Sequence, residues 1–118
     1  MIRNDPKRGE IWLINFDPTE GDEIQKRRPA VVLSSDAVGI LNLKIVVPLT
    51  EWKLEREKYL WLVTLNPNTE NGLDKKSSAD LLQVRSVSVR RFIRKLGFIR
   101  AAQLEEMLQA LAIVLEWA

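Results

Sequence analysis

Apolar residues follow two different spacings along the chain, and the change of spacing separates a strand-rich region from a C-terminal helix. Short apolar runs that are rich in aromatic and β-branched residues, and that are bounded by Pro, Gly, Asn or Asp, predict strands. Within residues 10–16, Trp12, Ile14 and Phe16 alternate with Ile11 and Leu13, so we expect a strand buried on both faces. The same reasoning predicts strands over residues 30–33, 43–49 and 59–65.

The segments between and after these strands carry turn and capping residues. Ser35 or Asp36 is placed to cap a single helical turn, residues 52–58 form a charged connection, and residues 66–72 have the composition of an exposed loop. Residues 78–87 predict a further strand, Ser88 is placed to cap a short helix through residue 93, and residues 96–99 predict a last short strand.

The most regular helical pattern covers residues 101–117. Its apolar residues recur at helical spacing, whereas Glu105, Glu106, Gln109 and Glu116 fall elsewhere on the helical wheel. We expect the apolar stripe to pack on the sheet, and a groove for a partner is the alternative. Short strands followed by one terminal helix predict a mainly β fold with a C-terminal α-helix, a small antiparallel barrel within a single domain over residues 1–118. The stripe consists of Leu104, Met107, Leu108, Leu111 and Leu115.

The charge of the chain indicates less about function than the spacing of its apolar residues indicates about the fold. Eighteen Lys and Arg residues against sixteen Asp and Glu residues leave a net charge of +2, which does not by itself indicate a nucleic-acid partner. The basic residues are clustered, however, so a basic face and ordinary solvated charges are both open interpretations. The clusters are Lys26, Arg27 and Arg28, and then Arg85, Arg90, Arg91, Arg94, Lys95 and Arg100.

The chain contains no cysteine and no histidine, and this narrows the possible chemistry. Disulfides, thiolate nucleophiles and cysteine-ligated metals are excluded, as are the ribonuclease and hydrolase mechanisms that depend on histidine. Carboxylates, Arg, Lys, Tyr and hydroxyl groups remain as catalytic groups. The first residues lack the apolar stretch of a signal peptide, and no later run reaches the length of a membrane span, so we expect a cytoplasmic protein without a membrane partner.

Several short motifs occur in an order that is more specific than any one of them. They are Arg8-Gly9-Glu10-Ile11-Trp12, the charged loop Asn15-Phe16-Asp17-Pro18-Thr19-Glu20-Gly21-Asp22-Glu23, Arg27-Arg28-Pro29, Pro48-Leu49-Thr50 and Gln83-Val84-Arg85-Ser86. In this order the chain, from about Lys7 onward, resembles the MazF/PemK family of toxin-antitoxin endoribonucleases. The resemblance implies an SH3-like barrel, a homodimer, a cognate antitoxin, and an mRNA interferase activity that needs no cofactor. It also implies metal-independent, sequence-selective cleavage of single-stranded RNA by attack of its own 2′-hydroxyl group.

The resemblance also suggests which residues act. Arg28, directly before a proline, and Thr50, at the end of a later strand, correspond to the family's catalytic pair. Glu23 occupies the position of a loop carboxylate that can accept the 2′-hydroxyl proton, and a solvated charge is its alternative interpretation. This loop reads Asp22-Glu23-Ile24-Gln25 and lacks the common Ser-Glu-Gln followed by glycines. Its dynamics and the preferred cut site are therefore expected to differ.

The remaining candidates would bind RNA rather than react with it. Gln83 can contact a base edge, and Arg85 can hold a phosphate. Trp52 lies near Thr50 in a charged segment and is the candidate for base stacking, whereas Trp12 and Trp61 lie within apolar runs and are expected in the core. A strand-edge hydrogen bond and surface charges are the structural alternatives. The further candidates for RNA binding are Lys26, Arg27 and Ser86.

Two other functions remain open from the sequence. One is a toxin of the same fold that inhibits DNA gyrase, and the other is a barrel that binds RNA without cutting it. The pair Arg28 and Thr50 favours the nuclease over the gyrase inhibitor, because inhibition of gyrase requires neither residue.

Overall fold

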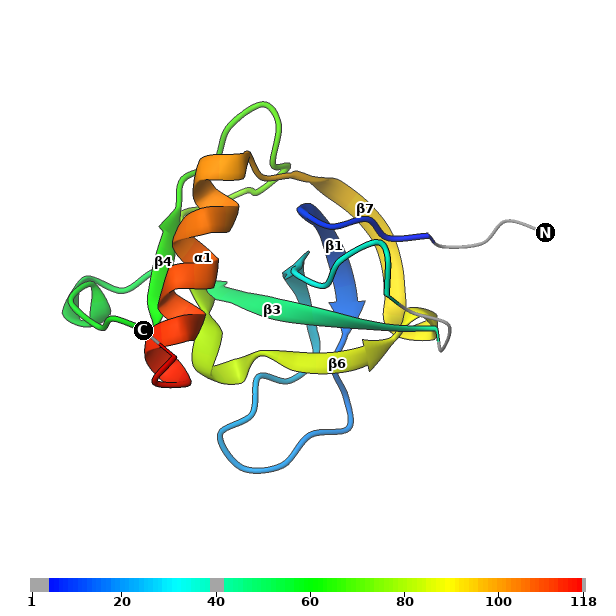
Figure 1. The fold of residues 1–118 in the computed structure, drawn as a ribbon, viewed down its shortest axis with the longest axis horizontal. Helices are drawn as coiled ribbons and strands as arrows, with labels where there is room; N and C mark the ends of the chain where they lie inside the picture. The colour runs from blue at the N-terminus through cyan, green and yellow to red at the C-terminus, as the bar shows by residue number, and fades with distance from the viewer. Residues whose placement is uncertain (1–4, 39–41, 118) are drawn as a thin grey trace.

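The computed structural model describes residues 5–38 and 42–117, and within them seven strands form one curled, antiparallel sheet (Figure 1). The strands are β1 (Glu10–Asn15), β2 (Arg27–Val32), β3 (Leu43–Glu51), β4 (Leu62–Leu65), β5 (Ser77–Asp80), β6 (Arg85–Ser88) and β7 (Phe92–Phe98). Short 3₁₀ helices occur at η1 (Leu54–Arg56), η2 (Leu81–Gln83) and η3 (Val89–Arg91), and the α-helix α1 spans Ala101–Val114. The predicted mainly β fold with a C-terminal helix is confirmed.

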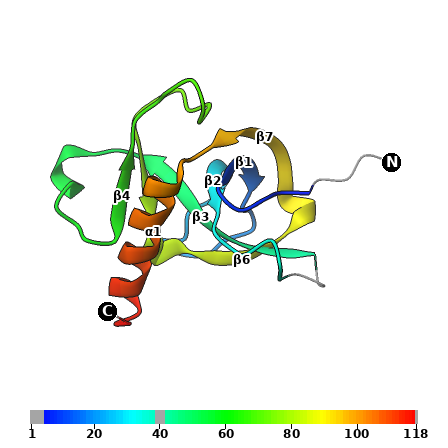
Figure 2. The same cartoon turned by 45° about the horizontal axis from the view of Figure 1, so that its top comes forward.

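Strand β3 lies at the centre of the sheet. The strand order is β4-β5-β3-β2-β1-β7, and β6 also pairs with β3. The described pairings do not show closure into the SH3-like barrel that we predicted. Helix α1 lies against β4 at one end of the sheet, as Figures 1 and 2 both show. No helix in the described residues is long and apolar enough to cross a membrane.

The segment predicted as one strand over residues 78–87 is two strands, and this correction has a clear geometric basis. Thr50 of β3 pairs with Ser78 of β5, and Val46 pairs with Arg85 of β6. Arg85 therefore lies seven residues after Ser78, whereas their partners on β3, Thr50 and Val46, are only four residues apart. The three extra residues form η2. The Asp80 carboxylate caps this turn by accepting a hydrogen bond from the Leu82 backbone N–H at 3.1 Å.

Two other local predictions needed adjustment. Ser88 does act as a cap, because its hydroxyl oxygen accepts the Arg90 N–H at 3.2 Å, but the helix it caps is only η3. Strand β7 therefore begins at Phe92, earlier than expected. The Ser35 hydroxyl accepts the Ala37 N–H at 3.1 Å, and the Val38 N–H donates to the Ser35 carbonyl at 3.2 Å, so Ser35 caps a single turn in the described part of this segment.

The buried apolar residues of the described ranges form two clusters, one on each face of β1. This agrees with the prediction that the first strand is buried on both faces. Ile11 belongs to a cluster that includes Met107 and Ala110 of α1, whereas Trp12 and Ile14 belong to the second. The Trp12 side chain is only 8% exposed, which confirms its predicted place in the core. The helix prediction is also confirmed, with Leu104 and Leu111 packed against the first cluster. The helix ends before Leu115, which is exposed, as is Trp117 beyond it.

The loop after β4 was predicted to be exposed, but it is anchored by a buried asparagine. Asn71 is 1% exposed, its amide nitrogen donates to the Asn66 carbonyl at 2.8 Å, and its amide oxygen accepts the Leu73 N–H at 3.1 Å. The Phe98 N–H donates to the Glu70 carbonyl at 3.0 Å. These contacts fix the loop on β7 and set the position of the residues that follow it.

Gly97 is the contact point between this loop and β7, and its replacement is expected to be costly. A Cβ at Gly97 would lie 2.2 Å from the Glu70 carbonyl oxygen and 2.6 Å from the Asn71 carbonyl carbon, both backbone atoms. Gly97→Ala should therefore lower the free energy of unfolding by about 3 kcal/mol, at the upper end of overpacking. Chemical denaturation measures this change.

Gly21→Ala is the control for this substitution. Gly21 has a φ of +55° but no atom within 4 Å of an added Cβ, so only backbone strain of about 1 kcal/mol is expected. If the free energy of unfolding falls equally in the two variants, the close approach of the loop to β7 does not explain the need for Gly97.

Candidate active site

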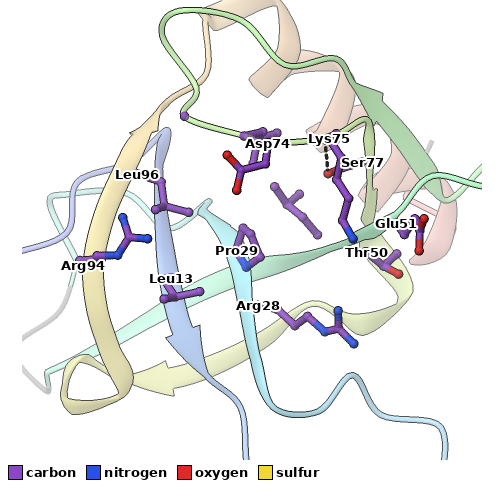
Figure 3. Close-up of a pocket in the computed structure, with 13 residues that line it drawn as sticks. Leu13, Arg28, Pro29, Thr50, Glu51, Asp74, Lys75, Ser77, Arg94 and Leu96 are labelled. Atoms are coloured by element: carbon purple, nitrogen blue, oxygen red, sulfur yellow. Dashed lines mark hydrogen bonds between the residues drawn. The ribbon is translucent and has the colours of Figure 1, made fainter.

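Arg28 and Thr50 lie on neighbouring strands and line the same hollow. Ala30 of β2 pairs with Pro48 of β3, so two steps further along both strands lead to Arg28 and Thr50. Pro29 favours an extended backbone at Arg28, which is the first half of this arrangement. Both side chains border a hollow of about 360 Å³, here called the Arg28–Thr50 hollow (Figure 3).

Apolar residues form one part of this hollow, and charged residues surround it. Leu13, Pro29, Leu49 and Leu96 are among the apolar residues that line it. In Figure 3, Lys75 extends toward Thr50 and Arg94 reaches in from β7. The charged lining residues are Arg28, Glu51, Asp74, Lys75 and Arg94. Three cations and two carboxylates therefore border the hollow, and the excess of positive charge favours an anionic group.

The guanidinium of Arg28 is available for a ligand. Its side chain is half-buried, and none of the described residues forms an ion pair or hydrogen bond with it. Its planar group can present two parallel N–H donors to an oxyanion, which a lysine cannot do. The Thr50 hydroxyl adds a single donor. Together they suit a group with several phosphoryl oxygens.

The predicted carboxylate Glu23 lies at a different hollow. This second hollow, of about 450 Å³ and here called the loop hollow, is lined by Glu23, Gln83 and Arg85 among others. The Glu23 carboxylate accepts the Glu20 N–H at 2.6 Å. The guanidinium carbon of Arg85 lies 5.6 Å from the centre of the Phe16 ring. Five of the candidate residues therefore lie at two hollows of one chain, Arg28 and Thr50 at the first and Glu23, Gln83 and Arg85 at the second.

Gln83 holds the β1–β2 loop with both ends of its amide group. Its nitrogen donates to the Asp22 carbonyl at 2.8 Å, and its oxygen accepts the Ile24 N–H at 3.0 Å. These bonds flank Glu23, so the position of Glu23 depends on Gln83. The predicted contact between Gln83 and a base is not tested by this geometry, but such a contact would compete with both bonds.

Replacement of Gln83 should loosen the loop. Gln83→Ala removes both bonds to the loop, and we expect amide hydrogen exchange at Ile24 to accelerate about tenfold, the scale of one lost hydrogen bond. Gln25→Ala is the control, since Gln25 is exposed in the same loop. If exchange at Ile24 is the same in both variants, Gln83 does not hold the loop.

The other RNA-binding candidates line neither of these two hollows. Lys26 is exposed with a φ of 67°, and its N–H donates to the Asp17 carboxylate at 2.8 Å at the base of the loop. Arg27 and Ser86 are exposed on β2 and β6. One face of the Trp52 ring is covered by Lys76, whose ammonium lies 3.7 Å from the ring centre. That contact reduces the ring area available for base stacking.

Sequence reasoning missed several residues of the Arg28–Thr50 hollow. Lys75 and Asp74 follow the loop anchored by Asn71 and precede β5, whose Ser77 and Ser78 pair with Glu51 and Thr50. Arg94 was assigned only to a general basic cluster. The sequence did not show that β3 pairs with β5. This pairing places the residues before β5 beside the hollow.

Comparisons with known proteins establish the family to which this chain belongs. The family model described as PemK-like, MazF-like toxin of type II toxin-antitoxin system matches residues 7–115. The chain belongs to this family and is an endoribonuclease toxin of a toxin-antitoxin system. This assignment favours the nuclease over the two alternative functions.

Individual relatives support the same assignment. The chain is 34% identical over 116 residues to endoribonuclease MazF9 of Mycobacterium tuberculosis, which covers 93% of this chain and 96% of the relative. It is similar to the crystal structure of MazF from Deinococcus radiodurans, with a TM-score of 0.78, 31% identity and coverage of 94% and 96% of the two chains. A MazE-MazF crystal structure from the same organism matches with a TM-score of 0.72, 30% identity and coverage of 96% and 97%.

Proposed function

We propose that this protein cuts single-stranded RNA at selected sequences, without a metal ion, by attack of the RNA's own 2′-hydroxyl on the adjacent phosphorus. The 2′-oxygen forms a bond to phosphorus while the bond to the 5′-oxygen breaks. The products are a 2′,3′-cyclic phosphate and a 5′-hydroxyl. The 2′-hydroxyl proton passes to a carboxylate, and the leaving 5′-oxygen takes a proton from water. The observation that supports this most strongly is the shared hollow of Arg28 and Thr50, with a guanidinium that forms no ion pair with any of the described residues.

In this proposal the protein acts chiefly by stabilising charge. Negative charge grows on the phosphoryl oxygens in the transition state, and fixed donors at that place lower the barrier without reorganisation. Arg28 would donate to two of these oxygens and Thr50 to one. Lys75, which extends toward Thr50, would add a second positive charge (Figure 3).

Which carboxylate accepts the 2′-hydroxyl proton depends on whether the protein acts as a monomer or as a homodimer. Within one chain, Glu51 and Asp74 line the Arg28–Thr50 hollow, whereas Glu23 lines the loop hollow. In the homodimer that we propose, loops at the dimer face border one extended groove for RNA. Glu23 of one chain would then serve the hollow of the other. Light scattering at micromolar concentration tests this assembly, and a monomer would contradict it.

We also propose that a cognate antitoxin blocks this groove. Complexes with MazE are seen for the MazF of Deinococcus radiodurans. An acidic, partly disordered segment laid across Lys26, Arg27, Arg28 and Arg85 would cover one basic residue of each hollow, Arg28 and Arg85, together with two exposed cations. Reversing the charge of Arg27 and Arg85 together should weaken the complex and make its affinity less dependent on salt. Unchanged affinity would place the antitoxin elsewhere.

The activity is tested on long RNA with mapped cut sites. Purified protein should cut single-stranded regions at a recurring short sequence, and Arg28→Ala should leave the same RNA intact over the same time. Cleavage at unrelated sequences would contradict selectivity. Supercoiling inhibition of DNA gyrase without any RNA cleavage would favour the gyrase-inhibiting alternative.

A further inference from the structure

A third hollow adjoins the Arg28–Thr50 hollow on β3. It has a volume of about 250 Å³, and here it is called the aromatic hollow, because Tyr59 and Trp61 line it. Thr50 and Glu51 line both this hollow and the Arg28–Thr50 hollow. A ligand chain that passes the catalytic pair would therefore meet the aromatic hollow next. The volume is below the range of about 300–1,000 Å³ for drug-sized ligands, so it suits one ring system.

The two aromatic rings form a preassembled stacking surface. The Tyr59 and Trp61 ring centroids lie 4.7 Å apart with an angle of 17° between the planes. Tyr59 is 37% exposed and Trp61 is half-buried, so the sequence-based placement of Trp61 in the core was wrong. Backbone bonds fix this segment, with the Leu81 N–H donating to the Trp61 carbonyl at 3.0 Å and the Leu62 N–H donating to the Tyr59 carbonyl at 3.3 Å. A ring that already stacks on a neighbour loses little freedom when a base stacks on it.

Asp80 supplies a polar group in the same hollow. One carboxylate oxygen accepts the Leu82 N–H, but an ionised carboxylate can accept about four hydrogen bonds. Burial raises the pKa of Asp80, and the backbone bonds from Leu82 and Gln83 with the nearby charge of Arg56 only partly oppose this shift. The carboxylate keeps acceptor capacity on the side of the hollow, and a ligand that donates a hydrogen bond would stabilise its charge.

We propose that the aromatic hollow holds one unstacked base of the RNA, next to the phosphate bound by Arg28 and Thr50. The base stacks on the Tyr59–Trp61 pair and donates a hydrogen bond from its amino group to Asp80. Single-stranded RNA is recognised by such a combination of stacking and base-edge contacts. The hollow therefore selects adenine, cytosine or guanine over uracil, because the only base-edge N–H donor of uracil, at N3, lies between two carbonyl oxygens that repel a carboxylate. This inference rests on the proposed function for the identity of its ligand.

The test compares full-chain variants on a randomised single-stranded RNA pool, with the cut sites sequenced. The wild type should disfavour uracil at one position beside the cut. Trp61→Ala should weaken binding about tenfold, as truncation of a stacking aromatic does, and should lose most of the discrimination, because a base that is not held on the ring no longer meets Asp80. Trp61→Phe should retain most of both. Asp80→Asn keeps the oxygen that caps Leu82 but adds an amide donor, so it should shift the preference toward uracil. Leu54→Ala is the control, since Leu54 is 69% exposed in the same connection.

The outcomes separate this inference from the proposed function. A wild-type base profile in both Trp61→Ala and Asp80→Asn would overturn the inference while leaving RNA cleavage intact. If Trp61→Ala does not fold, the Asp80→Asn profile decides. If the wild type cuts no RNA, the proposed function fails, and binding of a labelled single-stranded RNA octamer pool tests the hollow alone. If Trp61→Ala binds this pool about tenfold more weakly than Leu54→Ala does, base binding in the aromatic hollow is supported. Equal binding by the two variants would overturn the inference.

Discussion

Arg28→Ala is expected to lower kcat by on the order of 10² or more, the effect of losing a fixed donor at a developing charge. The fold should be unchanged, because Arg28 is half-buried and no described residue depends on it for an ion pair. Arg28→Lys should restore little activity, since a point charge does not replace two parallel donors. Thr50→Ala should have an effect of similar size. Steady-state cleavage of a short RNA measures these values.

The neighbouring arginine provides a matched control for this result. Arg27→Ala makes the same charge change one residue away, but Arg27 is exposed and does not line the Arg28–Thr50 hollow. We expect it to raise KM and to alter kcat much less. Equal losses of kcat in both variants would show that net charge, and not the placement of the guanidinium, accounts for the effect.

A substrate that lacks the 2′-hydroxyl at the cut site should bind but remain intact. The proposed reaction uses that hydroxyl as the nucleophile, so its removal leaves no attacking group, whereas the phosphate contacts of Arg28 and Thr50 are retained. Binding is measured by fluorescence anisotropy and cleavage by gel. The control is the same oligonucleotide with the deoxy substitution placed several nucleotides away, which should be cut normally. Cleavage at the substituted position would exclude 2′-hydroxyl attack.

The sequence predicted much of the fold because its signals are local. The apolar alternation in residues 10–16 and the helical stripe after residue 101 each report the face that an element buries, and both predictions are confirmed. The break between β5 and β6 was not predictable in this way. It follows from the pairing of both strands with the same β3, where three residues have no partner positions and form η2.

Long-range packing also explains why parts of the site were missed. Asn71 has a turn-forming composition around it, yet it is buried because the loop packs on Gly97, 26 residues later. Trp61 lies in an apolar run, yet it faces a hollow beside Tyr59. Arg28 and Thr50 were paired only through the family resemblance. The strand register now gives a physical reason for the pairing, while their catalytic roles remain proposals.

The most direct measurement is the chemical nature of the fragment ends after cleavage in the presence of a chelator. We expect continued cleavage, with a 2′,3′-cyclic phosphate on one fragment and a 5′-hydroxyl on the other, because the chain has no histidine or cysteine and the RNA supplies the nucleophile. Mass spectrometry and end-specific labelling distinguish these groups. Fragments with a 5′-phosphate and a 3′-hydroxyl, or loss of activity in chelator, would contradict metal-independent attack by the 2′-hydroxyl.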